Sequence, residues 1–152
     1  MSDVIFQGWH YAQQQGLLTA NPDVRLKLVM SGFTGASEED AINVDDITTL
    51  DEFDGLGYQE VDCENPAFAY STSDNEMQLD FDNDEFNESG GSVTPGSDDA
   101  IGIFVYLYVD GTDANDIALG FTDAGGFPFN ASNSAINLSI PVGGLMFVRQ
   151  AA

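Results

Sequence analysis

The stretch that decides the fold is residues 101–109, Ile-Gly-Ile-Phe-Val-Tyr-Leu-Tyr-Val, the most apolar run of the chain. Its β-branched and aromatic residues favour an extended strand, and its continuity predicts burial on both faces. We therefore expect residues 101–109 to form the central strand of a sheet. The Asp110-Gly111 pair that follows is typical of a hairpin turn.

Short candidate strands flank this run and are separated by residues that favour turns. Residues 24–30, Val-Arg-Leu-Lys-Leu-Val-Met, alternate as a half-buried strand does, with Val24, Leu26 and Leu28 on one face. Further strands are predicted over residues 57–62, 67–70, 76–80, 117–121, 136–140 and 145–150. This succession predicts a mainly β protein, with a single antiparallel β-sandwich or barrel-like domain over residues 1–152.

Two segments depart from the β pattern. Residues 1–20 predict an N-terminal helical arm, with a helix from residue 4 to residue 15 that Ser2 or Asp3 caps and Gly16 ends, although Gly8 is unfavourable inside a helix. Residues 31–56 combine glycine, serine and acids with a few apolar anchors. They predict a long acidic loop with one helical turn near residues 47–50.

The composition is strongly acidic, and this excludes several classes of protein. The chain has 26 Asp and Glu against 3 Lys and Arg, a formal net charge of −23. Because Arg25, Lys27 and Arg149 cannot neutralise a row of phosphates, we expect neither nucleic-acid binding nor docking on an anionic membrane. An apolar fraction of 43% is too high for a disordered acidic tail.

The acids are unevenly distributed along the chain. Residues 38–88 hold 18 of the 26 acids and no Lys or Arg, whereas residues 124–152 hold no acid. A solvated acidic surface keeps a protein soluble until it meets its partner. An excess of acids over lysine is also typical of adaptation to high salt, so a saline source is a second explanation.

Residue types that carry catalysis are scarce, and we expect no enzyme and no cofactor. His10 and Cys63 are the one histidine and the one cysteine, and no Gly-x-Ser-x-Gly motif accompanies them. We expect His10 to be structural or exposed and Cys63 to be a small buried residue. Among so many acids, chance pairs of carboxylates are inevitable and do not indicate a glycosidase.

Calcium is the ion that the acids best suit, although no specific metal site is expected. Asp80, Asp82 and Asp84 alternate as at the start of a calcium loop, and they are weak candidates for calcium ligands. The sixth position is not glycine and the twelfth is Gly91, so the segment is not an EF-hand. The oxygen-rich segments 45–54 and 110–116 are further candidates, while zinc is excluded for lack of Cys and His.

Residues 45–58, Asp-Asp-Ile-Thr-Thr-Leu-Asp-Glu-Phe-Asp-Gly-Leu-Gly-Tyr, carry a resemblance to a known class of proteins. The segment resembles one in small virion structural proteins of tailed bacteriophages, where a short helix and a strand like residues 24–30 precede it. An acidic segment like residues 79–86, an apolar strand like residues 101–109 and a Phe-Pro-x-Asn motif like residues 127–130 follow in order. The scarcity of lysine and the Pro-Val-Gly-Gly turn near the C-terminus depart from the class.

The resemblance implies a non-enzymatic capsid decoration, or cement, protein that binds the outer surface of a phage head and stabilises it. The implied partner is the major capsid protein of the same virion, and the implied assembly is a homo-oligomer, with a trimer favoured. Met1-Ser-Asp-Val has no basic stretch followed by an apolar run. We therefore expect synthesis in the host cytoplasm and a final location at the capsid surface of the virion.

The nearly neutral ends of the chain are the expected docking surfaces, with the acidic middle facing solvent. The candidate contact residues are the large apolar side chains of both ends: Phe6, Trp9, Tyr11, Phe127, Phe129, Met146 and Phe147. Core packing is the competing interpretation of these residues. Two other functions remain open, namely a tail or head–tail connector component of the virion and, more distantly, a calcium- or carbohydrate-binding β adhesion module.

Overall fold

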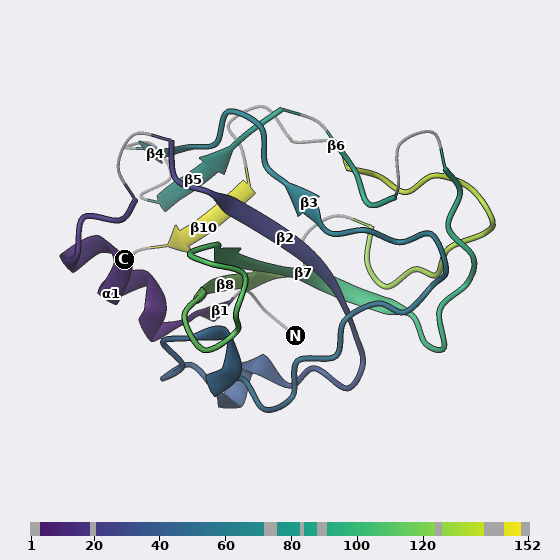
Figure 1. Ribbon diagram of the computed structural model, residues 1–152, viewed down its shortest axis with the longest axis horizontal. Helices are drawn as coiled ribbons and strands as arrows, with labels where there is room; N and C mark the ends of the chain where they lie inside the picture. The colour runs from purple at the N-terminus through teal and green to yellow at the C-terminus, as the bar shows by residue number, and fades with distance from the viewer. Residues whose placement is uncertain are drawn as a thin grey trace.

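The computed structural model describes residues 4–18, 21–71, 76–82, 84–87, 91–123, 126–138 and 145–149. The chain is mainly β, with 34% strand against 11% helix, and it contains one five-stranded antiparallel sheet and two smaller sheets (Figure 1). The prediction of a mainly β fold is confirmed. No closed barrel is found among the described residues.

The five-stranded sheet has the strand order β1-β8-β7-β2-β3. Its strands are β1 (Val4–Ile5), β2 (Val24–Met30), β3 (Val61–Asp62), β7 (Ala100–Leu107) and β8 (Ile117–Thr122). The central strand is β7, which pairs with β2 on one side and with β8 on the other. The apolar run at residues 101–109 therefore predicts the central strand correctly.

Two smaller sheets complete the β structure. The first has the order β10-β5-β4, and the second pairs β6 with β9. Their strands are β4 (Ala67–Ser71), β5 (Glu76–Asp80), β6 (Asp84–Glu85), β9 (Asn137–Leu138) and β10 (Leu145–Arg149). The strand predicted at 57–62 shrinks to two residues. Of the strand predicted at 136–140, residues 137–138 form β9, and residues 139–140 lie outside the described part of the structure. β1 and β6 were not predicted, because two residues carry no periodic pattern.

Two separate cores pack on the two faces of the central sheet. On one face, alternate residues of β2 and β7 pack with the helix and with β5, as in the cluster of Trp9, Leu26, Leu79 and Val105. On the other face, the remaining β7 side chains pack with aromatic residues from outside the strand, as in the cluster of Phe6, Phe33, Phe104 and Phe121. Because β7 supplies both cores, its sequence is continuously apolar.

The N-terminal segment differs from the predicted helix. Val4 and Ile5 form β1 on the edge of β8, and the helix α1 extends from Gln7 to Gln14. The prediction of a helix from residue 4 is wrong because the two β-branched residues alternate across the sheet, Val4 packing into one core and Ile5 against the other. The predicted stop is correct, since Gly16 has a φ of +68°. This one described helix, of eight residues, is too short to cross a membrane.

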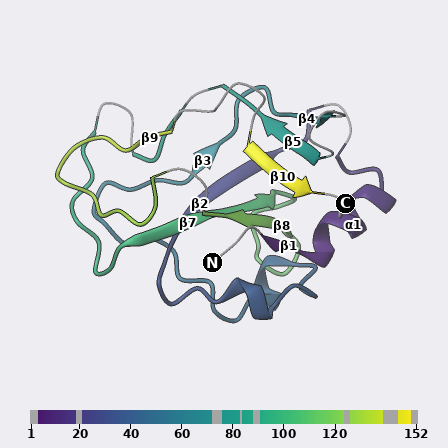
Figure 2. The same cartoon turned by 180° about the vertical axis from the view of Figure 1, so that it is seen from behind.

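The long acidic loop covers the second face of the sheet. It contains two 3₁₀ turns, η1 (Gly35–Ser37) and η2 (Val44–Asp46), so the helical turn lies earlier than the predicted residues 47–50. Ala41, Val44 and Ile47 pack in the same core as Phe104. In Figures 1 and 2 this loop lies on the side of the large sheet opposite to β4, β5 and β10.

Candidate functional site

Residues 45–58, the segment that carries the resemblance, run along β2 beyond the point where β3 ends. The amide of Met30 donates to the carbonyl of Asp51 across 2.7 Å, and the amide of Phe53 donates to the carbonyl of Leu28 across 2.9 Å. The amide of Leu28 donates to the hydroxyl of Tyr58 at 3.0 Å. The segment thus continues, along β2, the row of hydrogen-bond partners that β3 begins.

The acids of this segment fix neighbouring backbone by accepting hydrogen bonds. Asp46 accepts from the amides of Ile42 and Asn43 at 3.1 and 2.9 Å, and Asp51 accepts from the amide of Gly32 at 3.0 Å. Asp54 accepts from both the amide and the hydroxyl of Ser97, at 2.7 and 2.6 Å. These donors lower the pKa of Asp54, so the carboxylate form is favoured.

The two glycines of the segment allow a close approach to residues 92–94. A Cβ on Gly55 would lie 2.3 Å from the carbonyl oxygen of Thr94, and a Cβ on Gly57 would lie 2.3 Å from that of Ser92. Gly57 also has a φ of +90°, which favours glycine. The segment therefore acts as a strap that holds residues 92–97 and the loop at Gly32 against the sheet. We call residues 45–58 the β2 strap.

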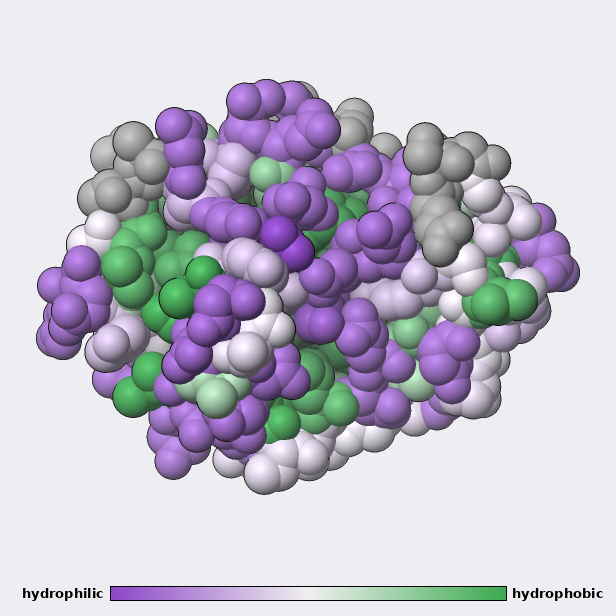
Figure 3. All heavy atoms as spheres, in the orientation of Figure 1, coloured by the Kyte–Doolittle hydropathy of each residue, from purple (hydrophilic) through white to green (hydrophobic). Residues whose placement is uncertain are grey.

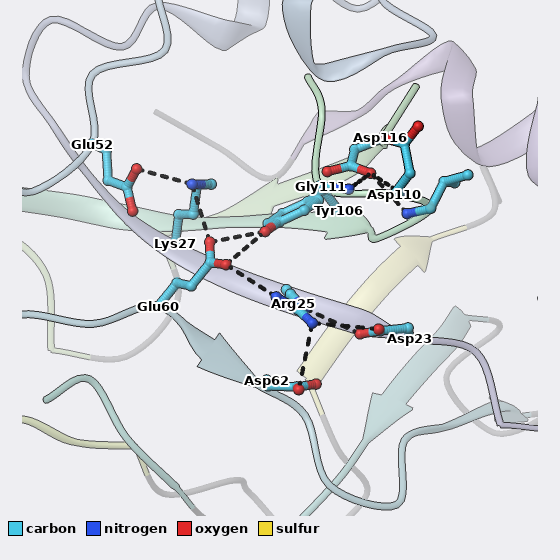
Figure 4. Close-up of polar contacts among 11 residues, drawn as sticks. Asp23, Arg25, Lys27, Glu52, Glu60, Asp62, Tyr106, Asp110, Gly111 and Asp116 are labelled. Atoms are coloured by element: carbon cyan, nitrogen blue, oxygen red, sulfur yellow. Dashed lines mark hydrogen bonds and ion pairs between the residues drawn. The ribbon is translucent and has the colours of Figure 1, made fainter. Parts of the chain in front are cut away.

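The outward face of β2 carries a polar network centred on Lys27 (Figure 4). The Nζ of Lys27 lies 2.9 Å from Glu52 and 3.0 Å from Glu60. The hydroxyl of Tyr106 donates a hydrogen bond to the Glu60 carboxylate across 2.8 Å. Burial alone would lower the pKa of Lys27, but the hydrogen bond and charge of Glu52, with the charge of Glu60, outweigh it and raise the pKa. Lys27 therefore stays protonated and does not act as a base at neutral pH.

Arg25 extends the same network toward the start of β2. Its guanidinium lies 3.2 Å from Asp23, 3.5 Å from Glu60 and 3.7 Å from Asp62. The guanidinium also lies 3.7 Å from the centroid of the Tyr108 ring. Both cations of β2 are therefore neutralised by acids from β3, from the β2 strap and from the chain next to them.

The hairpin loop between β7 and β8 is held by a buried carboxylate. Oδ1 of Asp116 accepts hydrogen bonds from the amides of Val109, Asp110 and Gly111 at 2.7, 3.2 and 3.2 Å. Asp110 accepts from Thr112, and this lowers the pKa of Asp110. Backbone and side-chain donors thus occupy oxygens that calcium would need in segment 110–116.

A groove of about 720 Å³ lies between β3 and β6. Its lining is mostly acidic or polar and consists of residues 59–64 with Asp84, Glu85 and Asn87. Cys63 is buried here, as predicted, and burial together with the charge of Asp62 raises the pKa of its thiol. The thiol therefore stays protonated and is a poor nucleophile.

The three calcium candidates do not converge on one point. Asp80 and Asp82 are exposed, whereas Asp84 is half-buried at the groove. The Asp82 carboxylate accepts from the side-chain amide of Asn65 at 2.8 Å, and the Asp84 carboxylate accepts from the amide of Glu85 at 2.7 Å. Within the described ranges, no group of three or more His, Cys, Asp or Glu side chains could hold a metal ion.

Two of the predicted contact residues are core residues, which corrects the sequence interpretation. Phe6 is 0% exposed and meets the edge of Phe104 with ring centroids 5.8 Å apart. Trp9 is 2% exposed and meets Phe68 at 5.1 Å. Both rings fill the space between the chain's N-terminal segment and the sheets, so neither can contact a partner.

The other predicted residues differ in their accessibility. Tyr11 is 40% exposed on α1, and His10 beside it is also exposed. Phe127 and Phe129 are half-buried, with ring centroids 5.4 Å apart. The side chains of Met146 and Phe147, which belong to β10, lie outside the described part of the structure.

Sequence reasoning missed several residues that organise these clusters. The sequence pattern indicated Tyr58 and Tyr106 only as apolar strand residues. In the structure the Tyr58 hydroxyl accepts from the amide of Leu28, and the Tyr106 hydroxyl donates to Glu60. The sequence analysis did not single out Asp116 among the many acids. Its position after a turn and just before β8 is nevertheless typical of a residue whose side chain caps a loop.

Comparisons with protein-family models, with curated proteins and with solved structures find no match to this chain. The resemblance of residues 45–58 and the motifs around them to phage virion proteins therefore stays a prediction from the sequence.

Proposed function

We propose that this chain is a non-enzymatic structural protein of a tailed-phage virion, a decoration protein bound to the outer surface of the head. The observation that carries the proposal is the ordered likeness of the sequence motifs to that class, of which the β2 strap is the most specific. The partner in this proposal is the major capsid protein of the same particle.

The roles of the side chains in the strap support a structural function. Its acids accept backbone hydrogen bonds, its glycines permit close packing, and Tyr58 supplies a partner to β2. None of these roles requires a substrate. A rigid body that is complete before docking loses little conformational entropy on binding, which suits a protein present in many copies on a shell.

The surface also suits this role. Hydrophilic side chains cover most of the face in Figure 3, and hydrophobic ones form separate patches. With a net charge of −23, free copies repel one another and avoid nucleic acid. Attachment of each copy can then be weak while many copies together stabilise the head.

Locating the chain in a reconstruction of the intact particle tests the proposal. Density for the chain on the outside of the head, in hundreds of copies, is the expected result. A few copies at the neck or tail would instead favour the connector or tail component. Absence of the chain from purified virions would contradict any virion function.

A further inference from the structure

Three segments that are distant in sequence meet at one end of the molecule, and none carries a charged residue. They are residues 55–57, 91–97 and 126–137, which contain no Asp, Glu, Lys, Arg or His. The amide of Thr94 donates to the carbonyl of Leu56, and the amide of Val93 donates to the carbonyl of Ser134, both across 3.0 Å. Figures 1 and 2 show these loops together, at the opposite end from α1. We call this surface the uncharged end.

The uncharged end is fixed by hydrogen bonds among its own segments. The side chain of Asn130 accepts from the amide of Gly96 at 2.8 Å and donates to the carbonyl of Gly96 at 3.3 Å. Phe129 exchanges two backbone hydrogen bonds with Ala100, at the start of β7. A surface fixed in this way needs little ordering when a partner binds.

Leu56 projects from the uncharged end and is 79% exposed, more than any other large apolar residue described. Its amide donates to the hydroxyl of Thr94 at 2.9 Å, and Thr94 in turn donates to its carbonyl. Because Gly55 and Gly57 pack tightly on either side, the turn holds the Leu56 side chain in solvent. Contact with a second molecule would remove this apolar side chain from water, which is favourable.

A groove of about 330 Å³ lies on the same end, and its lining is also uncharged. The lining consists of residues 129–132 and 134–137 with Gly126. Carboxylates lie at the border of the uncharged end, where Asp54 accepts a hydrogen bond from Ser97 and Asp98 accepts one from Ser31. A contact area without charges inside a charged border is the compositional pattern of protein–protein interfaces.

We propose that the uncharged end docks on a larger protein whose surface has no excess of positive charge. This inference rests on the proposed function, in which the larger protein is the shell of the head. Docking through an acidic face would remove carboxylates from water and would require a basic partner. Contact through the uncharged end leaves the exposed carboxylates in solvent and brings Leu56 into an apolar site. At the uncharged end a second copy is a poorer partner than the shell, because both bodies carry a charge of −23. The homo-oligomer that the resemblance implies would form through another surface.

The test is binding of the purified protein and its variants to head particles assembled without this chain. Leu56→Ser and Ala135→Glu alter the uncharged end at exposed positions, and Leu17→Ser is the matched control at a 40% exposed leucine beyond α1. We expect binding to weaken about tenfold or more for the first two variants and to stay unchanged for the control. Equal melting temperatures would show that all three variants fold.

Salt dependence gives a second, independent readout. Raising NaCl from about 0.05 M to about 0.5 M shortens the Debye length, so binding through the uncharged end should hold or strengthen. A loss of affinity with salt would indicate an acidic face on a basic partner and would overturn the inference. If wild-type protein binds heads and all variants bind equally, the docking surface is wrong while the proposed function stands. If wild-type protein does not bind heads at all, both are contradicted.

Discussion

The amide of Leu28 donates a hydrogen bond to the hydroxyl of Tyr58, 3.0 Å away in space and 30 residues away in sequence. On this side of β2, β3 pairs only with Arg25 and Leu26, so Leu28 has no strand residue opposite it. The phenolic oxygen of Tyr58 takes the place of a strand carbonyl and provides an acceptor for the buried amide of Leu28. Tyr58, the last residue of the β2 strap, therefore serves the backbone hydrogen bonding of β2.

Replacing Tyr58 by phenylalanine should destabilise the fold by about 1–3 kcal/mol, because the buried amide of Leu28 would lose its acceptor while the ring is retained. Urea unfolding of the variant and the wild type measures the difference. Tyr11→Phe, which removes a hydroxyl from an exposed ring, is the control and should leave stability unchanged. Equal stability of Tyr58→Phe and the wild type would show that water replaces the hydroxyl.

The hairpin loop between β7 and β8 should depend on the charge of Asp116. Three backbone amides donate to Oδ1 of Asp116. Asp116→Asn would therefore weaken all three hydrogen bonds and bury an additional amide donor. We expect a loss of about 1–3 kcal/mol in the free energy of unfolding. Asp113→Asn, in the same loop but exposed, should be neutral. A neutral effect of both variants would mean that the loop closes without the carboxylate.

The strands that the sequence predicted are those with a strong side-chain pattern. β7 is continuously apolar because both its faces are covered, and β2 alternates because Arg25 and Lys27 face the polar network. The start of the helix was missed for a tertiary reason, because Val4 and Ile5 pair with β8 instead. A tertiary contact also explains the glycine inside the helix. Gly8, which weakens a helix locally, is needed because a Cβ there would lie 2.1 Å from the carbonyl oxygen of Ala118.

The candidate site was less predictable because it depends on which segments meet. Phe6 and Trp9 lie in a neutral stretch and read equally well as docking or core residues until the sheets that cover them are known. The sequence did indicate a neutral C-terminal part. That residues 55–57 join it follows only from the fold, since they belong to the most acidic part of the chain.

Acid should destabilise the fold as the pH falls below about 4. Hydroxyl and amide donors from neighbouring serine and threonine residues lower the pKa of Asp54, Asp98 and Asp110. Because the folded pKa lies below the unfolded value of about 3.9, the stability these groups contribute is present above that pH. It is lost as the pH falls through the folded pKa.

Asp62 should change the stability in the opposite direction, at pH values above about 4. Burial and the charge of Asp23 raise the pKa of Asp62, so stability increases as the pH falls through its folded pKa. The melting temperature should therefore rise slightly as the pH falls from neutral toward the unfolded value of about 3.9, before the lowered pKa values of the other acids make it fall. Differential scanning calorimetry across this range measures the profile. Asp62→Asn should flatten the rise, and a steady decline from pH 7 in the wild type would contradict the assignment.

Monovalent salt should stabilise the folded protein. Residues 38–88 carry 18 acids and no Lys or Arg, and their mutual repulsion is screened as the Debye length shortens from about 10 Å at 0.1 M to about 3 Å at 1 M. Salt also weakens the ion pairs of Arg25 and Lys27, but two cations are outnumbered by the acids. We therefore expect the melting temperature to rise with NaCl.

Calcium at matched ionic strength separates screening from specific binding. Screening predicts melting temperatures in CaCl₂ close to those in NaCl, because the described acids do not converge on one ion site. Additional stabilisation by calcium, lost in Asp82→Asn, would instead favour a calcium-binding module. No response to either salt would contradict the saline explanation and would leave the acidity as a device that keeps free copies apart.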